Sequence, residues 1–470
     1  MTMTYDVVVV GSGPGGAVTA RECARRGLKV LVLEEGDRFE PGAVPPYSLA
    51  QMRRMYRDHG LTVALGRPSI TYTEARCVGG GSEVNAGLYH RPAASVLAEW
   101  TARFDVAALT PADLEPWHLV VEDRLRVERR RTPLPPASEV LRRGAEQLGW
   151  SGLEVPRWAS LDGSGRPIMH TMQRTYLDDA LQQGCEIRPR TRVRRLEISG
   201  GAVRRVVCDS GEAFRADRVV VSAGAVQTPA LLQRSGVAGR FGRGLSVHPT
   251  VKVVARFASI VTDPDEVPAY QVKEFAPDLT LGGSASREPL VALALGDTWS
   301  RDRDLLAEPR RNAVYYASIR SSGTGLVRAV PGFEAPMVTY RLTRRDLDLL
   351  RSGLARLLHL LLAAGAERVV PCYPGAPVVR GEADVAAASS GLGRDAALMT
   401  VHLTGTAPMG ERPERCPVDS FGSVRSVANL QVNDGSLLPS APGVNPQGTI
   451  MAVAHRNVAR LLGPGAGSER

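Results

Sequence analysis

The sequence predicts a mixed α/β fold, α+β overall, in which a domain built on a parallel sheet is interrupted by a unit built on an antiparallel sheet. Three observations carry this prediction. Residues 5–36 run as strand, glycine turn, helix, strand and acid, which is the order of a βαβ unit. Residues 170–225 return to α/β character after a helical stretch. From residue 248 the strands follow one another closely, until a last strand and helix close the chain.

The first βαβ unit carries a nucleotide-binding pattern. Residues 7–10 are four valines, and the turn after them reads GSGPGG. Gly11 permits the tight turn, Gly13 lets backbone N–H groups approach a pyrophosphate, and Gly16 allows the helix to pack closely on the strand. Glu34, at the end of the second strand, is placed to accept hydrogen bonds from ribose hydroxyls. The pattern predicts a dinucleotide site, open to either NAD or FAD.

The composition is that of a soluble globular protein. The 470 residues are enough for two or three domains, with 43% hydrophobic and 23% charged residues. The net charge of +9 has its densest run at residues 126–131, which lacks the aromatic residues and motifs of a nucleic-acid site. We therefore expect no nucleic-acid partner. The six cysteines include no C-x-x-C pair, so neither a metal site nor a disulfide framework is expected.

The sequence also favours a cytoplasmic protein. The first strand is preceded by no charged, apolar and cleavable leader. The longest apolar helical run, residues 354–366, is too short to span a bilayer and contains Arg356 and His359. We expect no transmembrane segment and a cytoplasmic location.

The periodic patterns divide the chain into segments. We assign residues 1–95, 161–250 and 395–470 to one discontinuous dinucleotide-binding domain, because strand–turn–helix units recur in all three. Residues 96–160 have helical periodicity and are predicted as a helical insertion. Residues 251–394 are rich in strands and contain one long amphipathic helix, so we interpret them as the substrate domain.

Further motifs recur along nearly the whole chain. They read CVGGGSEVNAG (77–87), GAVQTPALLQRSGV (224–237), HLTGTAPMG (402–410) and NLQVNDGSLLPSAPGVNPQGTIMAVA (429–454). Together with the first glycine turn, they resemble the glucose-methanol-choline (GMC) oxidoreductases, nearest the cholesterol oxidase and long-chain alcohol oxidase branch. The resemblance implies a Rossmann-like FAD-binding domain with an inserted substrate domain on an antiparallel sheet. It further implies an FAD enzyme that oxidises an alcohol CH–OH to a carbonyl by hydride transfer to flavin N5.

The resemblance also assigns cofactor contacts to individual positions. The glycine turn and Glu34 resemble the adenosine and pyrophosphate site, the second glycine stretch resembles the loop along the isoalloxazine and ribityl, and the last helix begins at the flavin. The residues concerned are Gly11, Gly13, Pro14, Gly16, Glu34, Gly80, Ser82, Asn85, Ala86, Val193, Asp434, Pro446 and Gln447. Some members attach FAD through a histidine where this chain has Val84, so we expect non-covalent FAD. Ala238, where the family usually has glycine, indicates a minor loop change.

Two residues are predicted to act on the substrate. By resemblance, His402 and Asn445 form the pair that faces the alcohol at the flavin. An imidazole titrates near the working pH, so His402 suits the base role, and the Asn445 amide can only hold the oxygen by a hydrogen bond. The free N–H groups of a helix beginning near Pro446 would face the anionic reduced flavin. We interpret His248 and His455 as structural.

Several alternatives stay open at this point. O₂ or another acceptor can reoxidise the flavin, and some GMC-like proteins with FAD cleave cyanohydrins as hydroxynitrile lyases. The branch favours a sterol or long-chain alcohol, whereas an aromatic content of only 5% favours a compact polar substrate, such as the primary hydroxyl of a sugar or aminosugar. Glu274 and Asp297 are the candidate pocket acids for an amine.

Overall fold

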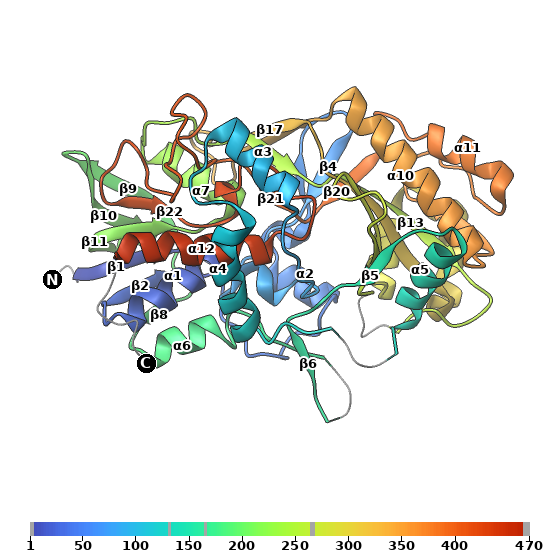
Figure 1. Ribbon diagram of the computed structural model, residues 1–470, viewed down its shortest axis with the longest axis horizontal. Coiled ribbons are helices and arrows are strands. Elements are labelled where there is room, and N and C mark those ends of the chain that lie inside the picture. Colours follow the sequence, from blue (N-terminus) through green and yellow to red (C-terminus); the bar gives the residue numbers. More distant parts are fainter. Residues whose placement is uncertain (1–3, 130–132, 164–166, 264–267, 464–470) are drawn as a thin grey trace.

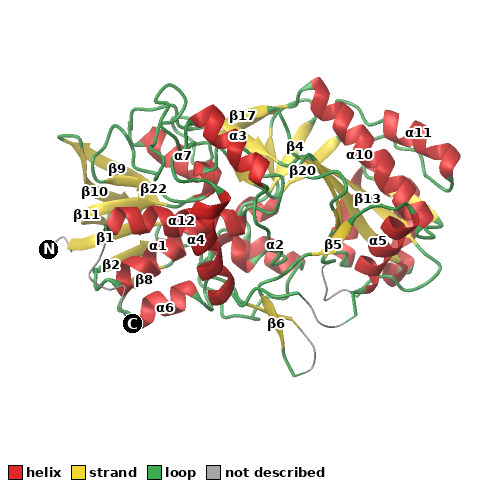
Figure 2. Cartoon of the chain, viewed as in Figure 1, coloured by secondary structure: helices red, strands yellow, loops and turns green. Residues whose placement is uncertain are grey.

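The computed structural model describes residues 4–129, 133–163, 167–263 and 268–463. A seven-stranded sheet lies at one end of the elongated molecule and a nine-stranded sheet at the other (Figure 1). Helices cover both sheets, and long loops connect them (Figure 2). The mixed α/β fold predicted from the sequence is confirmed. The basic run at residues 126–131 extends beyond the described residues.

The seven-stranded sheet is the parallel sheet that the sequence predicts. It contains β1 (Thr4–Val10), β2 (Val30–Leu33), β8 (Glu186–Arg188), β9 (Val193–Ser199), β10 (Ala202–Cys208), β11 (Ala213–Val221) and β22 (Leu430–Val432). The parallel pairs join β8 to β2, β2 to β1, β1 to β11 and β11 to β22, while β10 and β9 add an antiparallel extension. The central position of β1 therefore places the first glycine turn at the middle of the carboxyl edge.

Both faces of this sheet are buried, which explains the uninterrupted valines. Val7 and Val9 pack with α1 (Pro14–Arg25) on one face, whereas Val8 and Val10 belong to the core on the other face. The helices around the sheet are α3 (Ala94–Phe104), α4 (Pro111–Arg124), α6 (Tyr176–Gln182), α7 (Gly224–Arg234) and α12 (Gln447–Leu462). Parallel strands buried on both faces have such continuous apolar runs.

The nine-stranded sheet forms the second end of the molecule. It contains β3 (Thr62–Ala64), β4 (Ser69–Tyr72), β5 (Gly152–Glu154), β13 (Thr250–Arg256), β14 (Tyr270–Val272), β15 (Leu279–Gly283), β16 (Asn312–Ile319), β19 (Arg368–Pro371) and β20 (Ala397–Thr400). Its pairs are antiparallel except for β4 with β20. One face packs against the amphipathic helix α10 (Arg344–Ala363), whose buried leucines share a core with the strands.

The packing crosses the predicted segment boundaries, which remain a proposal. Within residues 96–160, α3 and α4 pack at the seven-stranded end, but α5 (Pro136–Gln147) packs on α10, and β5 extends the nine-stranded sheet. Strands β3, β4 and β20 also belong to that sheet, although their residues fall in segments 1–95 and 395–470. Periodicity indicates a helix or a strand, but it does not indicate which sheet the element joins.

Smaller elements complete the chain. A four-stranded sheet contains β12 (Arg243–Val247), β17 (Thr324–Arg328), β18 (Met337–Arg341) and β21 (Leu403–Thr404), and β6 (Ala159–Leu161) pairs with β7 (Pro167–Met169). The remaining helices are α2 (Leu49–Met55), α8 (Glu288–Ala294), α9 (Trp299–Asp302) and α11 (Glu382–Ser390), with 3-10 turns at Arg57–Gly60, Gly80–Glu83, Gly296–Thr298, Arg303–Ala307, Pro309–Arg311 and Gly435–Leu437. Over the described ranges, every helix is too short or too polar to cross a bilayer.

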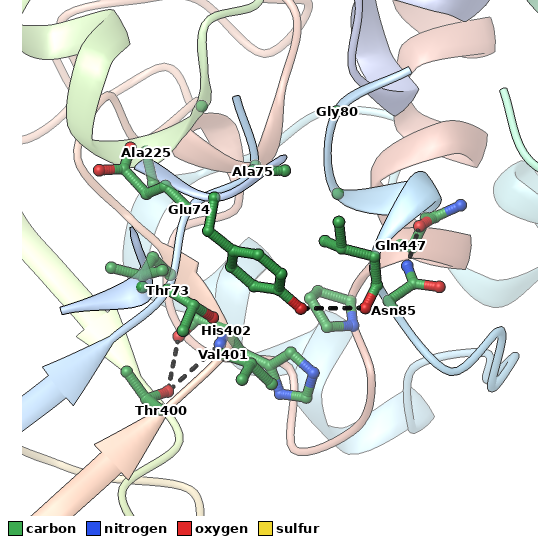
Figure 3. Close-up of a pocket in the computed structure, with 18 of the residues that line it drawn as sticks. Thr73, Glu74, Ala75, Gly80, Asn85, Ala225, Thr400, Val401, His402 and Gln447 are labelled. Carbon is green, nitrogen blue, oxygen red and sulfur yellow. Dashed lines mark hydrogen bonds between the residues drawn. The ribbon is translucent and has the colours of Figure 1, made fainter. Parts of the chain in front are cut away.

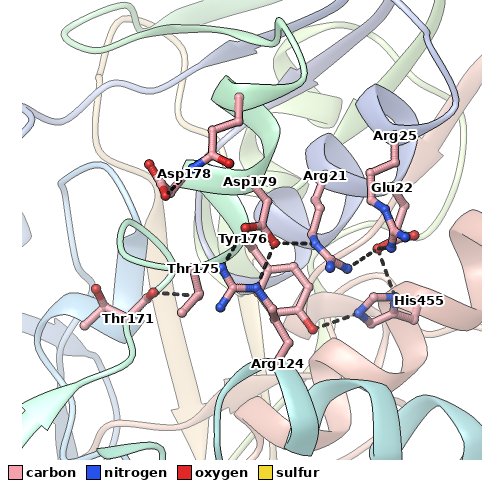
Figure 4. Close-up of polar contacts among 11 residues, drawn as sticks. Arg21, Glu22, Arg25, Arg124, Thr171, Thr175, Tyr176, Asp178, Asp179 and His455 are labelled. Atoms are coloured by element: carbon pink, nitrogen blue, oxygen red, sulfur yellow. Dashed lines mark hydrogen bonds and ion pairs between the residues drawn. The ribbon is translucent and has the colours of Figure 1, made fainter.

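A polar cluster joins the helices at the seven-stranded end. The Asp179 carboxylate accepts hydrogen bonds from Arg21 Nε and Arg124 Nε, each at 2.7 Å (Figure 4). Nearby, the buried ring of His455 on α12 lies with its Nε2 3.0 Å from the Tyr176 hydroxyl. These contacts connect α1, α4, α6 and α12, so His455 has the structural surroundings that the sequence analysis expects.

Candidate active site

One cavity of about 820 Å³ is lined by residues of both large sheets. Its walls include the first glycine turn, the second glycine stretch, the start of α12 and one face of the nine-stranded sheet. In Figure 3, Asn85 and Gln447 are drawn on one side of this cavity, with His402 and Thr400 on another. Segments from the beginning, middle and end of the chain thus meet around a single space.

The nucleotide end of the cavity begins at the carboxyl edge of β1. Gly11, Gly13 and Pro14 line the cavity. Gly16 does not, because it packs against the turn: a Cβ there would lie 2.0 Å from the Gly11 carbonyl oxygen. Gly11 itself has φ of +96°, a conformation that favours glycine. Two glycines shape the turn, and α1 begins at it without a side-chain cap.

Glu34 lies at this end, held by the protein. Its Oε2 accepts hydrogen bonds from the Ser12 N–H at 3.0 Å and the Ser12 hydroxyl at 2.7 Å, and its Oε1 accepts one from the Gly36 N–H at 2.8 Å. A carboxylate offers about four lone-pair sites. Glu34 lines the cavity, so one site is left for a ribose hydroxyl, and that role stays a prediction.

The second glycine stretch reaches the cavity through only some of the predicted residues. Gly80, Asn85 and Ala86 line it. Asn85 donates from Nδ2 to Gln447 Oε1 at 2.7 Å, which ties this stretch to the start of α12. Ser82 points into the protein instead: its hydroxyl donates to the Gly79 carbonyl and accepts from the Met172 N–H. The structure therefore does not bring Ser82 to the cavity, because its hydroxyl stabilises the glycine turn.

Val193 and Asp434 complete the predicted contacts on this side. Both line the cavity, as do Pro446 and Gln447. Asp434 accepts hydrogen bonds at Oδ2 from the Gly224 N–H and at Oδ1 from the Ser436 N–H, at 2.9 and 2.8 Å. Burial raises the pKa of this carboxyl, and the hydrogen bonds oppose that rise. The Asp434 side chain mainly fixes the loop before α12. A ribityl chain would therefore contact a carboxylate that already accepts these hydrogen bonds.

The two predicted catalytic residues meet in the cavity. His402 lies between β20 and β21, and Asn445 lies just before α12. Asn445 Nδ2 is 3.3 Å from His402 Nε2. Burial, and secondly the charge of Lys273, lowers the pKa of His402 to about 4, so the imidazole is neutral near pH 7. A neutral imidazole and a carboxamide, 43 positions apart in the chain, face the same space.

His248 contacts His402 from behind, which the sequence analysis did not anticipate. The Nδ1 atoms of the two rings are 2.9 Å apart, and His248 Nε2 accepts a hydrogen bond from the Gly443 N–H at 2.9 Å. Burial lowers the pKa of His248 well below its usual range, so its one proton must be on Nδ1, and it donates to His402 Nδ1. That bond places the proton of His402 on Nε2, whereas the Asn445 Nδ2 donor needs an unprotonated Nε2, so the two contacts require opposite tautomers of His402.

The comparisons with known proteins show the family to which the chain belongs. Two stretches, residues 52–250 and 313–454, match the family described as GMC oxidoreductase. The chain is 36% identical to an uncharacterized GMC-type oxidoreductase of Sinorhizobium fredii, over 97% of this chain and 94% of that protein. The chain belongs to the GMC oxidoreductases. It is accordingly an oxidoreductase that acts on alcohols, and residues 9–60 also match an NAD(P)-binding Rossmann-like domain.

Two further proteins resemble this GMC oxidoreductase, one in sequence and one in fold. The long-chain-alcohol oxidase FAO4B of Arabidopsis thaliana is 30% identical over 96% of this chain and 66% of its own length. The crystal structure of pyridoxine 4-oxidase from Mesorbium loti superposes with a TM-score of 0.75 at 18% identity, over 97% of this chain and 98% of that chain. The second likeness concerns the fold alone.

The residues of this GMC oxidoreductase fit FAD, the cofactor that the family implies. Two buried donors in the cavity wall, Arg234 Nη1 and Trp158 Nε1, have no hydrogen-bond partner among the described residues. Gly80 lies against the first glycine turn, where a Cβ would be 2.7 Å from Gly13 Cα. Unpartnered donors and a wall without side chains are what an elongated, anionic dinucleotide requires.

Sequence reasoning missed the residues on the wall opposite the nucleotide end. Besides His248, the cavity is lined there by Thr250, Lys252, Gln271, Lys273, Thr280, Tyr316 and Ser318. In the sequence, only the alternation of these polar residues with apolar ones could be recognised. Of the two candidate acids, Asp297 lines the cavity, whereas Glu274 is exposed and accepts hydrogen bonds from the N–H and hydroxyl of Ser151.

Proposed function

We propose that this enzyme binds FAD non-covalently and oxidises a primary or secondary alcohol, with His402 as the proton acceptor and Asn445 as the group that holds the alcohol oxygen. The observation that carries the proposal is the convergence of these two side chains in the cavity that begins at the first glycine turn. FAD, when bound, supplies the hydride acceptor. The valine at position 84, which lines the cavity, offers no nucleophile for a covalent flavin link.

The proton inventory at His402 is compatible with the base role. Taking a proton at Nε2 requires the other tautomer, in which His402 donates from Nδ1 to His248 and the Gly443 N–H loses its acceptor. Losing one buried hydrogen bond costs about 1–3 kcal/mol. A substrate hydroxyl that donates to Nε2 offsets part of this cost, so the base form is within reach when an alcohol binds. His248 is thus a positioning residue, not a catalytic one.

The test is anaerobic reduction of the flavin by alcohols. In His402→Ala, bleaching of the yellow colour should slow by roughly 10²- to 10⁴-fold, the usual scale for the loss of a general base. His359→Ala is the matched control, because this half-exposed histidine on α10 contacts Glu382 away from the cavity. Rates for His402→Ala within a few-fold of the control would reject the base role.

The same experiment separates the two classes of reaction. An alcohol that bleaches the flavin without O₂ identifies an oxidoreductase, whereas a hydroxynitrile lyase would release aldehyde and cyanide from a cyanohydrin while the flavin stays yellow. Acid precipitation tests the non-covalent link, because colour that stays in the pellet contradicts it. A polar face of the nine-stranded sheet borders the site, which favours the compact polar alcohol, such as a sugar hydroxyl, over a sterol or long-chain alcohol.

A further inference from the structure

Four neighbouring strands of the nine-stranded sheet have one apolar and one polar face. In β13, β16, β15 and β14, which are adjacent in that order, residues such as Val251, Ala317 and Leu281 enter the core shared with α10. The alternate residues line the cavity, as expected from the two-residue period of a strand. We call these residues, with Lys273 just after β14, the polar wall; they are Thr250, Lys252, Gln271, Lys273, Thr280, Tyr316 and Ser318.

The polar wall is held in place by its own hydrogen bonds. Lys273 Nζ donates to Thr280 Oγ1 at 3.2 Å, and Gln271 Nε2 donates to the Tyr316 hydroxyl at 3.0 Å. Gln271 Oε1 is buried and lacks a partner among the described residues. Hydrogen-bonded side chains with unused polar atoms form a prearranged surface for a polar ligand.

The two cations of the wall are unusual in this chain. The 58 lysines and arginines include only three lysines, and two of them, Lys252 and Lys273, line the cavity. Burial lowers the pKa of both, that of Lys273 to about 7. Both side chains are half-buried, and an ammonium withdrawn from bulk water without a counter-charge is unfavourable. Its presence on a cavity wall therefore points to a ligand that supplies the charge.

Two arginines of the cavity are treated differently, whereas a third, Arg234, has a buried Nη1 without a partner among the described residues. Arg57 pairs with Glu35 and Glu74, and Arg320 pairs with Glu99 at 2.7 Å. In the part of the chain that the structure describes, neither Lys252 nor Lys273 forms an ion pair. Asp297 also lines the cavity, and both Asp297 and Lys252 lie close enough to Cys372 to influence the pKa of its thiol. Lys252 therefore has an acid in its neighbourhood. Among the described residues, no acid contributes to the pKa of Lys273, which burial alone lowers. Lys273 also lies close enough to His402 to lower the pKa of that histidine, which makes it the stronger candidate anchor.

We propose that the substrate is an alcohol that carries an oxyanion, a carboxylate or a phosphate monoester, and that Lys273 binds this oxyanion, with Lys252 as a second cation on the same wall. This inference rests on the proposed function and narrows its substrate class. An aminosugar would bring a further positive charge to two cations, and a long alkyl chain would bury the polar atoms of the wall without partners, which is unfavourable.

The test measures anion binding to the purified, FAD-loaded protein by titration calorimetry. The probes are inorganic phosphate and acetate, which report the two forms of oxyanion separately and need no turnover. At least one should bind saturably to the wild type near pH 6.5, about tenfold more weakly to Lys273→Met and a few-fold more weakly to Lys252→Met, because a hydrogen bond to a charged group contributes about 1.5 kcal/mol or more. Absence of binding by both anions overturns the proposal.

Lys29→Met is the matched control. This third lysine is exposed and lies over the Tyr5 ring, away from the cavity, so its loss should leave anion binding unchanged. Equal affinities in Lys273→Met and Lys29→Met also overturn the proposal. In Lys273→Met and Lys252→Met, methionine keeps the length of the lysine and removes a half-buried charge, so the variants should fold, and an unchanged flavin spectrum verifies this.

A substrate comparison then connects binding to turnover. In the wild type, the rate constant of anaerobic flavin reduction divided by Kd should be at least tenfold higher for D-glycerate or glycerol 3-phosphate than for glycerol. Lys273→Met should lose that preference. If Lys273→Met slows reduction by glycerol as much as by its anionic analogues, the lysine acts at the reacting hydroxyl and the oxyanion proposal is wrong. A flavin that no alcohol bleaches would instead reject the proposed function, while calorimetry still decides the anion site.

Discussion

Two groups of cations, one between helices and one in the cavity, balance their charge in opposite ways. Between α1, α4 and α6, Arg21 and Arg124 share the carboxylate of Asp179. On the polar wall, Lys252 and Lys273 face the cavity with no ion pair among the described residues. Where a cation holds helices together, the chain supplies the counter-charge. Where a cation faces the cavity, the substrate supplies it on our proposal.

Removing the shared carboxylate should have the largest effect on stability. Asp179→Ala leaves Arg124 without its acid, close to an Arg21 that is paired only with Glu22 among the described residues, and we expect it to lower the free energy of unfolding by about 2–3 kcal/mol. Hydrogen bonds from Arg124 and Arg21 outweigh burial and lower the pKa of this carboxyl. Thermal and urea unfolding measure the change, and phosphate or acetate affinity should not move. Weaker anion binding in this variant would contradict the proposed difference between the two groups of cations.

The pH dependence of substrate preference should show the next largest effect. The ammonium of Lys273 is charged below its pKa of about 7 and neutral above it. The groups that it influences, His90, His248 and His402, all have pKa values lowered by burial and stay neutral in this range. The ratio of kcat/KM for the anionic over the neutral alcohol should therefore fall about fivefold from roughly pH 7 to 8.

The ratio isolates the anion site, because steps common to both alcohols cancel. In Lys273→Met it should be independent of pH over the same range. A wild-type ratio that stays constant or rises with pH would contradict a charged Lys273 as the anchor.

The smallest expected effect is a gain in stability. Lys252→Met removes a cation that burial disfavours and keeps the methylene contacts, so we expect the free energy of unfolding to rise by about 1 kcal/mol in the absence of anions. Differential scanning calorimetry in an anion-poor buffer measures it, with Lys29→Met expected to lie within about 0.5 kcal/mol of wild type. A less stable Lys252→Met would mean that this lysine holds the fold together, as Arg124 does.

The contrast between cofactor end and polar wall also explains what the sequence could predict. Gly11, Gly16 and Glu34 lie within one continuous βαβ unit, so local spacing is enough to anticipate their arrangement. His402 and Asn445 were found by their motifs and do meet in the cavity. Ser82 has the right motif, yet its hydroxyl turns inward, because the side-chain direction depends on the tight turn at Gly79.

The polar wall could not be predicted because its meaning depends on sheet order. The alternation of Thr250, Lys252 and their neighbours is that of any strand with one solvated face. Only the pairing of β13 with β16, and of β15 with β14, places the polar faces side by side. Likewise, local spacing could not predict the contact of His248 with His402, because it bridges 154 positions.

His402 is fastened to two different sheets at once. Two residues before it, Thr400 ends β20 of the nine-stranded sheet, and directly after it Leu403 begins β21, which pairs with β12 of the four-stranded sheet. An enzyme engineer who exchanges the substrate-facing half of this protein for that of a relative therefore cannot treat the imidazole as part of the retained scaffold. A crossover point between residues 400 and 403 would separate the ring from one of its supports, whereas crossovers outside residues 397–404 would transfer strand, base and strand as one module.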